Sequence, residues 1–149
     1  MQFLYLKQMV MVGFSERTDF LKEVNKNSSV IPDLLNILEK HSCNTNGEIK
    51  NKFIIYSKFD SSKPKKFTIS VGPKSLNSQY INDFSIIRIH EGNYMKFPVH
   101  NNSREKINDK WMEILMFFAN KYVTHQRAFK SDFEQHSSDG SVDIYVSIK

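Results

Sequence analysis

The residues best suited to chemistry lie near the C-terminus, in two β-prone runs, 127–136 and 142–148, separated by a loop rich in Ser, Asp and Gly. In the second run every other residue is branched and apolar, and side chains alternate between strand faces, so this set should pack beneath the helices. A turn centred directly after Asp139 would place Glu134 opposite Tyr145. The alternation therefore predicts Glu134 and Tyr145 on the sheet face away from the helices.

A carboxylate beside a phenol on such a face could hold a cation in a cleft, with the carboxylate supplying charge and the ring supplying cation–π contact. A partly desolvated Glu134 with a raised pKa could instead act as a general base. The same pattern also fits a solvated cross-strand pair on an open sheet face, because exposed glutamates are common. The residues alone leave these interpretations open.

Other kinds of site find little support in the sequence. The histidines have no metal-like spacing, and the pair formed by His41 and Cys43 falls short of the three or four ligands that zinc needs. No glycine-rich phosphate loop and no nucleophile elbow is present, and no base that would activate Cys43 can be identified. The sequence predicts no metal and no cofactor. The histidines are His41, His90, His100, His125 and His136.

Two helices are predicted to position the strands. Apolar residues recur at helical spacing from Ile31 to Leu38, with Ser29 as a candidate N-cap, which predicts a helix over 31–41. A longer helix should begin with a cap at Ser103 and end near residue 122. Its buried stripe includes Trp111, which is therefore expected in the core, bordering the floor of a cavity. The full stripe is Ile107, Trp111, Ile114, Leu115 and Phe118.

The order strand, helix, strand, strand occurs twice, at an offset of about 76 to 80 residues. This predicts an α+β fold of two tandem strand-helix-strand-strand modules, over about 1–72 and 83–149, joined by a polar linker at about 73–82. Each module is too small to be stable alone, so the two should share a core or pair their sheet edges, with a groove at the seam. The other predicted strands are 3–14, 53–59, 67–71 and 84–97.

Length and charge describe an ordinary globular chain. The 149 residues suit a single domain, and 21 Lys and Arg against 16 Asp and Glu give a net charge of +5. The densest basic run, 63–66, is typical of a solvated turn, so direct contact with nucleic acid is not expected. The single cysteine favours a reducing cytosol. The N-terminus lacks the basic region and the small-residue cleavage site of a signal peptide, and no apolar stretch is long enough for a membrane helix. We therefore expect a soluble cytoplasmic protein.

Motifs along the whole chain resemble the GyrI-like effector-binding domains. The more specific ones lie in the second half: residues 92–97, Trp111 within a helix, 132–134 and 142–149. Weaker ones are 13–15, 53–56 and 67–72. Domains of this kind occur as the ligand-sensing part of AraC- and MerR-type bacterial transcription regulators, as integron-associated binding proteins and as free-standing proteins.

The resemblance implies two such modules related by a pseudo-twofold axis, with a cleft between them that binds a hydrophobic or cationic aromatic small molecule. It implies that Glu134 is the charge partner of the ligand. A link to transcription regulation is a further expectation, but direct contact of this protein with nucleic acid or with a membrane is not expected. With the aromatic and Met positions included, the expected ligand-binding residues are Glu134, Tyr94, Tyr145, Tyr56, Trp111 and Met11.

Two alternatives stay open from the resemblance. Some relatives are hydrolases of reactive compounds, in which case Glu134 and Tyr94 would be catalytic; another relative is a protein–protein inhibitor, so a protein partner such as a regulator is conceivable and unknown. The chain also departs from the family pattern at 135–136, where an aromatic is common, and at Ser147, where Pro is common. Glu91, Asp132 or Asp143 could add a second acid near the groove.

Overall fold

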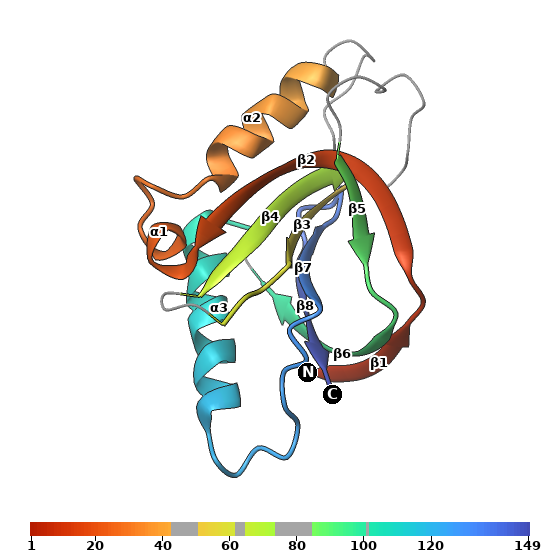
Figure 1. Ribbon diagram of the computed structural model, residues 1–149, viewed down its shortest axis with the longest axis vertical. Helices are drawn as coiled ribbons and strands as arrows, with labels where there is room; N and C mark the ends of the chain where they lie inside the picture. Colours follow the sequence, from red (N-terminus) through yellow and green to blue (C-terminus); the bar gives the residue numbers. More distant parts are fainter. Residues whose placement is uncertain (43–50, 62–64, 74–84, 101) are drawn as a thin grey trace.

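The computed structural model describes residues 1–42, 51–61, 65–73, 85–100 and 102–149. Within these ranges the chain forms eight strands and three helices (Figure 1). The strands are β1 (Gln2–Leu6), β2 (Met9–Asp19), β3 (Lys52–Ser57), β4 (Lys66–Pro73), β5 (Ser85–Ile89), β6 (Gly92–Val99), β7 (Ser131–His136) and β8 (Val142–Ile148). The helices are α1 (Phe20–Val24), α2 (Ile31–Ser42) and α3 (Arg104–Ala119).

The strands form one antiparallel sheet in the order β1-β6-β8-β7-β3-β4-β2-β5. Strands β1 and β2 follow each other along the chain, as do β5 and β6, and the two runs pair in a single register, from Gln2 opposite Lys96 to Gly13 opposite Ser85. Because β1 and β6 begin the sheet while β2 and β5 end it, this ladder joins the two ends and curls the sheet (Figure 1).

Gly13 lies where β2 changes partner, from β5 before it to β4 after it. A β carbon at this position would lie 1.9 Å from the backbone oxygen of Val71. No side chain tolerates such an approach, so a glycine is required at the bend.

Helices α2 and α3 cover the same face of the sheet. Leu34 of α2 packs in a cluster with Ile54 of β3, and Ile114 of α3 packs in a cluster with Ile144 of β8. Ile54 and Ile144 both lie opposite Glu134 of β7, so all three project from one face. The predicted α+β fold, with an antiparallel sheet and two helices on one face, is confirmed.

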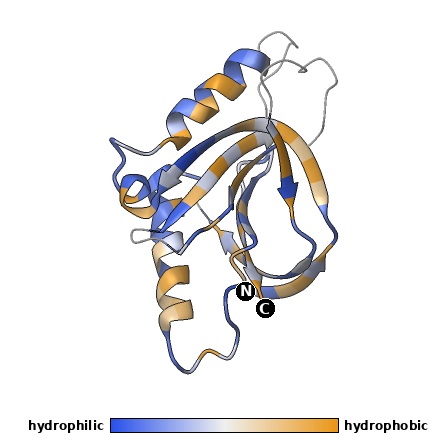
Figure 2. Ribbon diagram, in the orientation of Figure 1, coloured by the Kyte–Doolittle hydropathy of each residue, from blue (hydrophilic) through white to orange (hydrophobic). Residues whose placement is uncertain are grey.

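A third hydrophobic cluster fills the inside of the curled sheet. It includes Ile55, Ile89 and Phe133, each of which is almost completely buried. Hydrophobic and hydrophilic residues alternate along parts of several strands (Figure 2), but β3, β4 and β8 are buried on both faces. The face away from the helices is therefore packed, and the expectation of an open or cleft-bearing face there is wrong.

The predicted helices are confirmed, and the Ser103 side chain caps α3 as expected. Helix α3 ends at Ala119, before the predicted residue 122. Other details differ as well: the predicted strand 3–14 forms β1 and β2, and the predicted strand 84–97 forms β5 and β6. Helix α1 follows β2 directly, with an N-cap at Asp19. Strand β7 begins only at Ser131, while Arg127 forms an isolated bridge with Ile148.

Some predicted features lie outside the described residues: Cys43, the linker after Pro73, and Lys63 and Pro64 of the basic run. Among the residues that are described, none of the helices has the length and apolar composition needed to cross a membrane.

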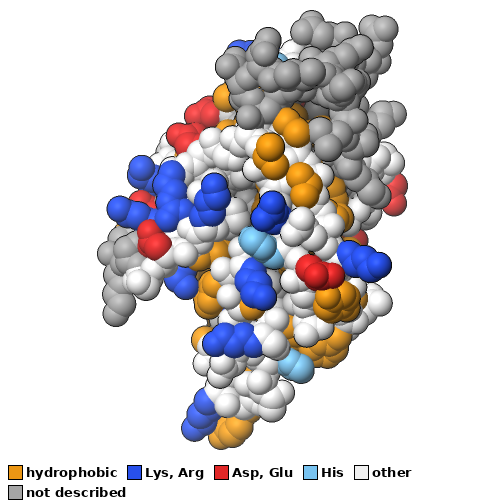
Figure 3. All heavy atoms as spheres, turned by 45° about the vertical axis from the view of Figure 1, so that its right-hand side comes forward, with side chains coloured by type: hydrophobic (Ala, Val, Ile, Leu, Met, Phe, Trp, Pro, Cys, Tyr) orange, Lys and Arg blue, Asp and Glu red, His pale blue; other side chains and the backbone are white. Residues whose placement is uncertain are grey.

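Lys and Arg side chains are spread over the face shown in Figure 3, with acidic and hydrophobic side chains between them.

Candidate functional site

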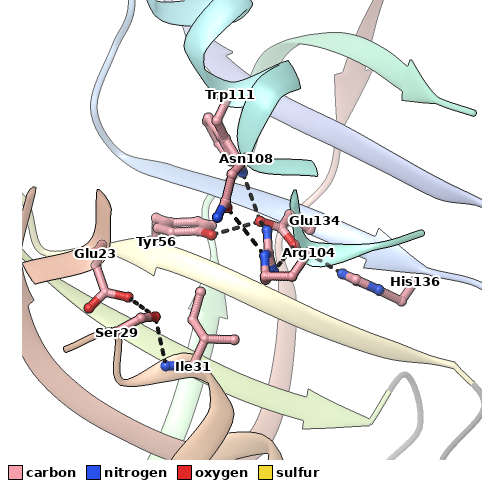
Figure 4. A network of polar contacts seen from close by, with 9 residues as sticks. All are labelled: Glu23, Ser29, Ile31, Tyr56, Arg104, Asn108, Trp111, Glu134 and His136. Atoms are coloured by element: carbon pink, nitrogen blue, oxygen red, sulfur yellow. Dashed lines mark hydrogen bonds and ion pairs between the residues drawn. The ribbon is translucent and has the colours of Figure 1, made fainter. Parts of the chain in front are cut away.

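Glu134 is the centre of a buried polar network (Figure 4). Arg104 donates two hydrogen bonds to its carboxylate, from Nη1 to Oε1 at 3.0 Å and from Nη2 to Oε2 at 2.7 Å. The Tyr56 hydroxyl donates to Oε2 at 2.6 Å, and the Trp111 indole N–H donates to the same oxygen at 2.7 Å. His136 Nε2 lies 2.9 Å from Oε1. Both carboxylate oxygens are therefore fully engaged by side chains.

The network holds Glu134 in its charged form. Burial alone would raise the pKa of Glu134, but the Arg104 charge and hydrogen bonds from His136 and Arg104 hold that pKa well below its ordinary value. Burial and the adjacent Glu134 charge raise the pKa of the Tyr56 phenol well above its usual range. A carboxylate with a low pKa is a weak base at neutral pH, so the predicted general-base role, which needed a raised pKa, is not supported.

Three elements bring these side chains together. The cap at Ser103 makes Arg104 the first residue of α3, and Trp111 follows two helical turns later on the same side of the helix. Strand β3 pairs with β7, and Tyr56 and Glu134 project from the same face of this pair, toward α3. The α3 N-terminus is thereby fastened to the centre of the sheet.

The predicted pairing of Glu134 with Tyr145 is wrong by one residue. Glu134 lies opposite Ile144, and Phe133 lies opposite Tyr145. The loop between β7 and β8 contains an odd number of residues, so the hairpin is centred on Asp139 itself and not after it. A shift of one residue exchanges the two faces of a strand. Glu134 therefore faces α3, and Tyr145 faces the inside of the curled sheet.

Three of the expected ligand-binding residues, Tyr94, Tyr145 and Met11, belong to the cluster inside the curl. The Tyr145 ring stacks on Phe133, with ring centroids 4.5 Å apart. The edge of Tyr94 meets the same ring, with centroids 5.7 Å apart. The structure thus places these three residues in the packed interior and away from the Glu134 network.

The Tyr94 hydroxyl is committed to the backbone and to a neighbouring side chain. It donates to the His90 carbonyl oxygen at 2.6 Å and lies 2.9 Å from Ser131 Oγ. Burial raises the pKa of Tyr94 to about 12. Because Tyr94 and Glu134 lie on opposite faces of the sheet, the catalytic pair expected for a hydrolase is not formed.

A cavity of about 360 Å³ adjoins the network on the helix-covered face. Trp111 and Tyr56 form part of its wall, with ring centroids 5.0 Å apart. Glu134 lies behind these two rings and is not among the described residues that line the cavity; neither is Glu91. The apolar lining comes from both halves of the chain: Phe20, Val24, Ile31, Phe59, Phe67, Met112 and Leu115.

Part of the cavity wall carries a compensated pair of charges. Asp132 is fully buried, and Arg127 Nη2 donates to its Oδ2 at 2.5 Å. Ser147 donates to the other oxygen through its backbone N–H at 2.8 Å and its hydroxyl at 3.0 Å. Lys65 and Arg127 both lie over the Phe129 ring, and burial together with the Arg127 charge lowers the pKa of Lys65.

Glu23 of α1 adds another carboxylate to the wall. Its Oε1 accepts from Ser29 Oγ at 2.7 Å, and its Oε2 accepts from Thr18 Oγ1 at 2.8 Å and from the Val30 backbone N–H at 3.2 Å. These bonds tie α1 to the start of α2, close to Tyr56 in Figure 4. All three donors are uncharged.

Sequence reasoning named Asp132 as an acid near the cleft but missed its ion-pair partner Arg127, and it missed Arg104 and Glu23. A signal for Arg104 is present, since it directly follows the predicted cap and lies seven residues before Trp111, on the same side of a helix. Glu23 gave no comparable signal, because α1 was not predicted. Over the described ranges, no group of three or more His, Cys, Asp or Glu side chains could hold a metal ion.

The domain thus combines a curled antiparallel sheet, helices over one face, and an aromatic-walled cavity beside the buried carboxylate of Glu134. The sequence matches the family of integron-associated effector binding proteins, Cass2, over residues 3–148. The chain belongs to this family. No curated protein matches the chain at the sequence level.

Solved structures share the fold. A Vibrio cholerae integron cassette protein aligns with a TM-score of 0.80 and 22% identity, covering 99% of this chain and 95% of that one. The protein SAV2435, bound to tetraphenylphosphonium, aligns with a TM-score of 0.70 and 15% identity over 99% of this chain and 93% of that one. A candidate transcription regulation protein from Staphylococcus aureus MU50 aligns with a TM-score of 0.66 and 12% identity over 99% and 97%.

Proposed function

We propose that this protein is an effector-binding protein that holds a bulky hydrophobic or cationic aromatic molecule in the cavity between α1, the start of α2 and α3. The observation that carries the proposal is the cavity itself, about 360 Å³ in volume and walled by Trp111, Tyr56 and Phe67. That volume lies within the range of small-molecule sites, about 300–1,000 Å³, and such sites are typically apolar with a few fixed polar groups.

The aromatic walls favour planar or multi-ring ligands. Trp111 and Tyr56 meet at an interplanar angle of 64°, so a ligand ring could stack on one while meeting the edge of the other. Electron-rich ring faces also stabilise a cation within about 6 Å. The tetraphenylphosphonium bound by SAV2435, which shares the fold, supports a ligand of this type.

Trp111 provides the assay, because it is the only tryptophan in the chain and it lines the cavity. Titration with tetraphenylphosphonium should change the Trp111 fluorescence in a saturable way, and calorimetry should give the same dissociation constant. Leu115→Phe narrows the cavity and should weaken binding at least about tenfold, since an added ring must displace ligand volume.

Met116→Phe is the matched control, because Met116 is 72% exposed one residue further along α3. This variant should bind like the unmodified protein. If Leu115→Phe binds as well as Met116→Phe, the ligand lies elsewhere and the proposed cavity is refuted.

A link to transcription regulation is part of the proposal and is supported by the fold shared with the Staphylococcus aureus protein. In such a role, ligand binding would alter contact with a separate DNA-binding partner. Helix α1 is the element through which this could occur, because Phe20, Glu23 and Val24 line the cavity while Leu21 is 60% exposed. Hydrogen exchange of α1 with and without tetraphenylphosphonium tests whether it responds to the ligand.

A further inference from the structure

The carboxylate that selects the charge of the ligand must present negative charge to the cavity. Glu134 does not meet this requirement. Its carboxylate is fully buried, it lies behind Tyr56 and Trp111, and Arg104 neutralises its charge through a bidentate ion pair. A ligand cation would have to displace a covalently attached guanidinium to use this group, and bidentate Arg–carboxylate pairs are among the strongest polar contacts in proteins.

Glu23 meets the requirement. It lines the cavity, and its three hydrogen-bond donors are two hydroxyls and a backbone N–H, so its position is fixed while its negative charge is retained. None of the ion pairs among the described residues involves Glu23. Its Oε1 accepts only one of these bonds and has capacity for another contact.

The surrounding charges leave a negative excess at this part of the wall. Burial opposes the charge on Arg104, while the carboxylates of Glu134 and Glu23 both raise the pKa of Arg104, so one guanidinium lies near two carboxylates. Of the other charged groups that line the cavity, Asp132 is compensated by Arg127. Two groups remain, Lys65, whose Nζ lies 3.4 Å from the Phe129 ring centroid, and Asp109, an exposed acid on α3.

We infer that Glu23, and not Glu134, is the residue that gives the cavity its preference for a cationic aromatic ligand, and that Arg104 is the internal counterion that withdraws Glu134 from this role. The inference rests on the proposed function, because it assumes that the cavity is the ligand site. The cation would lie between the Glu23 carboxylate and the rings of Tyr56 and Trp111. The aromatic substituents would contact the apolar lining.

The test compares two ligands of similar shape, the cation methyltriphenylphosphonium and the neutral triphenylphosphine oxide, at low ionic strength. The unmodified protein should bind the cation more tightly. Glu23→Gln keeps the size of the side chain and should reduce cation affinity about tenfold or more, the range of a charge-assisted contact, while affinity for the oxide stays the same. Retained oxide binding also shows that the variant is folded.

Two controls distinguish a direct contact between Glu23 and the ligand from the general electrostatic effect of removing a negative charge near the cavity. Asp109→Asn removes one negative charge from the same wall and should change cation affinity much less than Glu23→Gln. The double variant Arg104→Gln with Glu134→Gln removes the internal pair without changing net charge, and it should keep the preference for the cation. If Glu23→Gln is poorly folded, Val24→Lys places a competing cation at the wall and should reduce only phosphonium binding.

The possible failures are distinguishable. If the unmodified protein binds neither ligand, the proposed function fails and the inference fails with it. If both ligands bind with equal affinity, or if Glu23→Gln leaves their ratio unchanged, Glu23 is not the charge-selecting residue. The proposed function still stands in that case if Leu115→Phe weakens binding and Met116→Phe does not. Equal effects of Glu23→Gln and Asp109→Asn would also overturn the assignment.

Discussion

Removing Arg104 should destabilise the protein more than removing its partner Glu134. In Arg104→Gln the Glu134 carboxylate, which is fully buried, loses its only permanently charged partner. Breaking a buried ion pair in this way costs about 3–5 kcal/mol. Because the Arg104 side chain is 32% exposed and Tyr56 and Trp111 still donate to Glu134, we expect a loss near the lower end, about 3 kcal/mol.

The reverse substitution, Glu134→Gln, should cost less. The unpaired Arg104 guanidinium is already partly exposed and can turn toward water, while the Gln amide oxygen still accepts from Tyr56 and Trp111. We expect a loss of about 1–2 kcal/mol, the usual cost of a weakened buried hydrogen bond. In the double variant the two losses should not add, because the second substitution removes the group that the first leaves unpaired.

Urea denaturation of the four proteins in this cycle measures these free energies of unfolding, and a thermal shift of roughly 2–4 °C per kcal/mol gives an independent check. Lys110→Gln is the control, since it removes an exposed ion pair with Glu113 on the same helix and should change stability by less than about 0.5 kcal/mol. A loss of under about 1 kcal/mol for Arg104→Gln, or a larger loss for Glu134→Gln, would refute the account of a desolvated carboxylate.

Three further predictions follow from single sites. Gly13→Ala should destabilise the protein by about 3 kcal/mol or more in urea titrations, and more than Gly72→Ala, whose added carbon would lie 3.0 Å from a backbone oxygen instead of 1.9 Å. Tyr94→Phe should cost about 1–2 kcal/mol through lost buried hydrogen bonds but leave tetraphenylphosphonium affinity unchanged; altered affinity would contradict its placement. The pKa of Glu134 is lower in the folded than in the unfolded state, so ionised Glu134 stabilises the fold above about pH 4.3. This contribution to the free energy of unfolding should be lost as the pH falls toward the folded-state pKa, and urea titrations of Glu134→Gln should not show this pH dependence.

Periodicity predicted the helices because their apolar stripes are long and their caps are chemically explicit. Ser103 accepts a hydrogen bond from the Lys106 backbone N–H, as its residue type suggests. The short helix α1 was missed because five residues carry too little periodic signal. The repeated order of elements was visible in the sequence, but the curl was not, since it depends on pairing between segments far apart in the chain.

The site shows where sequence parity reaches its limit. Glu134 was recognised as important, but its face was predicted wrongly. The hairpin is centred on Asp139 and not between Asp139 and Gly140, and this difference decides which face of the sheet every residue of β7 occupies. Tyr56 and Trp111 were among the candidates and do line the cavity. Arg104 and Glu23 could not be placed, because their roles depend on which helix end approaches which strand.

The ladder that joins β1–β2 to β5–β6 also has a consequence for the time course of folding. Gln2 pairs with Lys96, so the first strand cannot take its place until β6, far along the chain, has been made and ordered. Contacts of such long sequence separation lose loop-closure entropy before the paired strands contribute favourable energy, and this slows folding. Because β1 pairs with β6 and β2 pairs with β5, either half by itself would have an unpaired strand edge. Unpaired edges are the feature of a sheet that most readily pairs with another chain and causes aggregation.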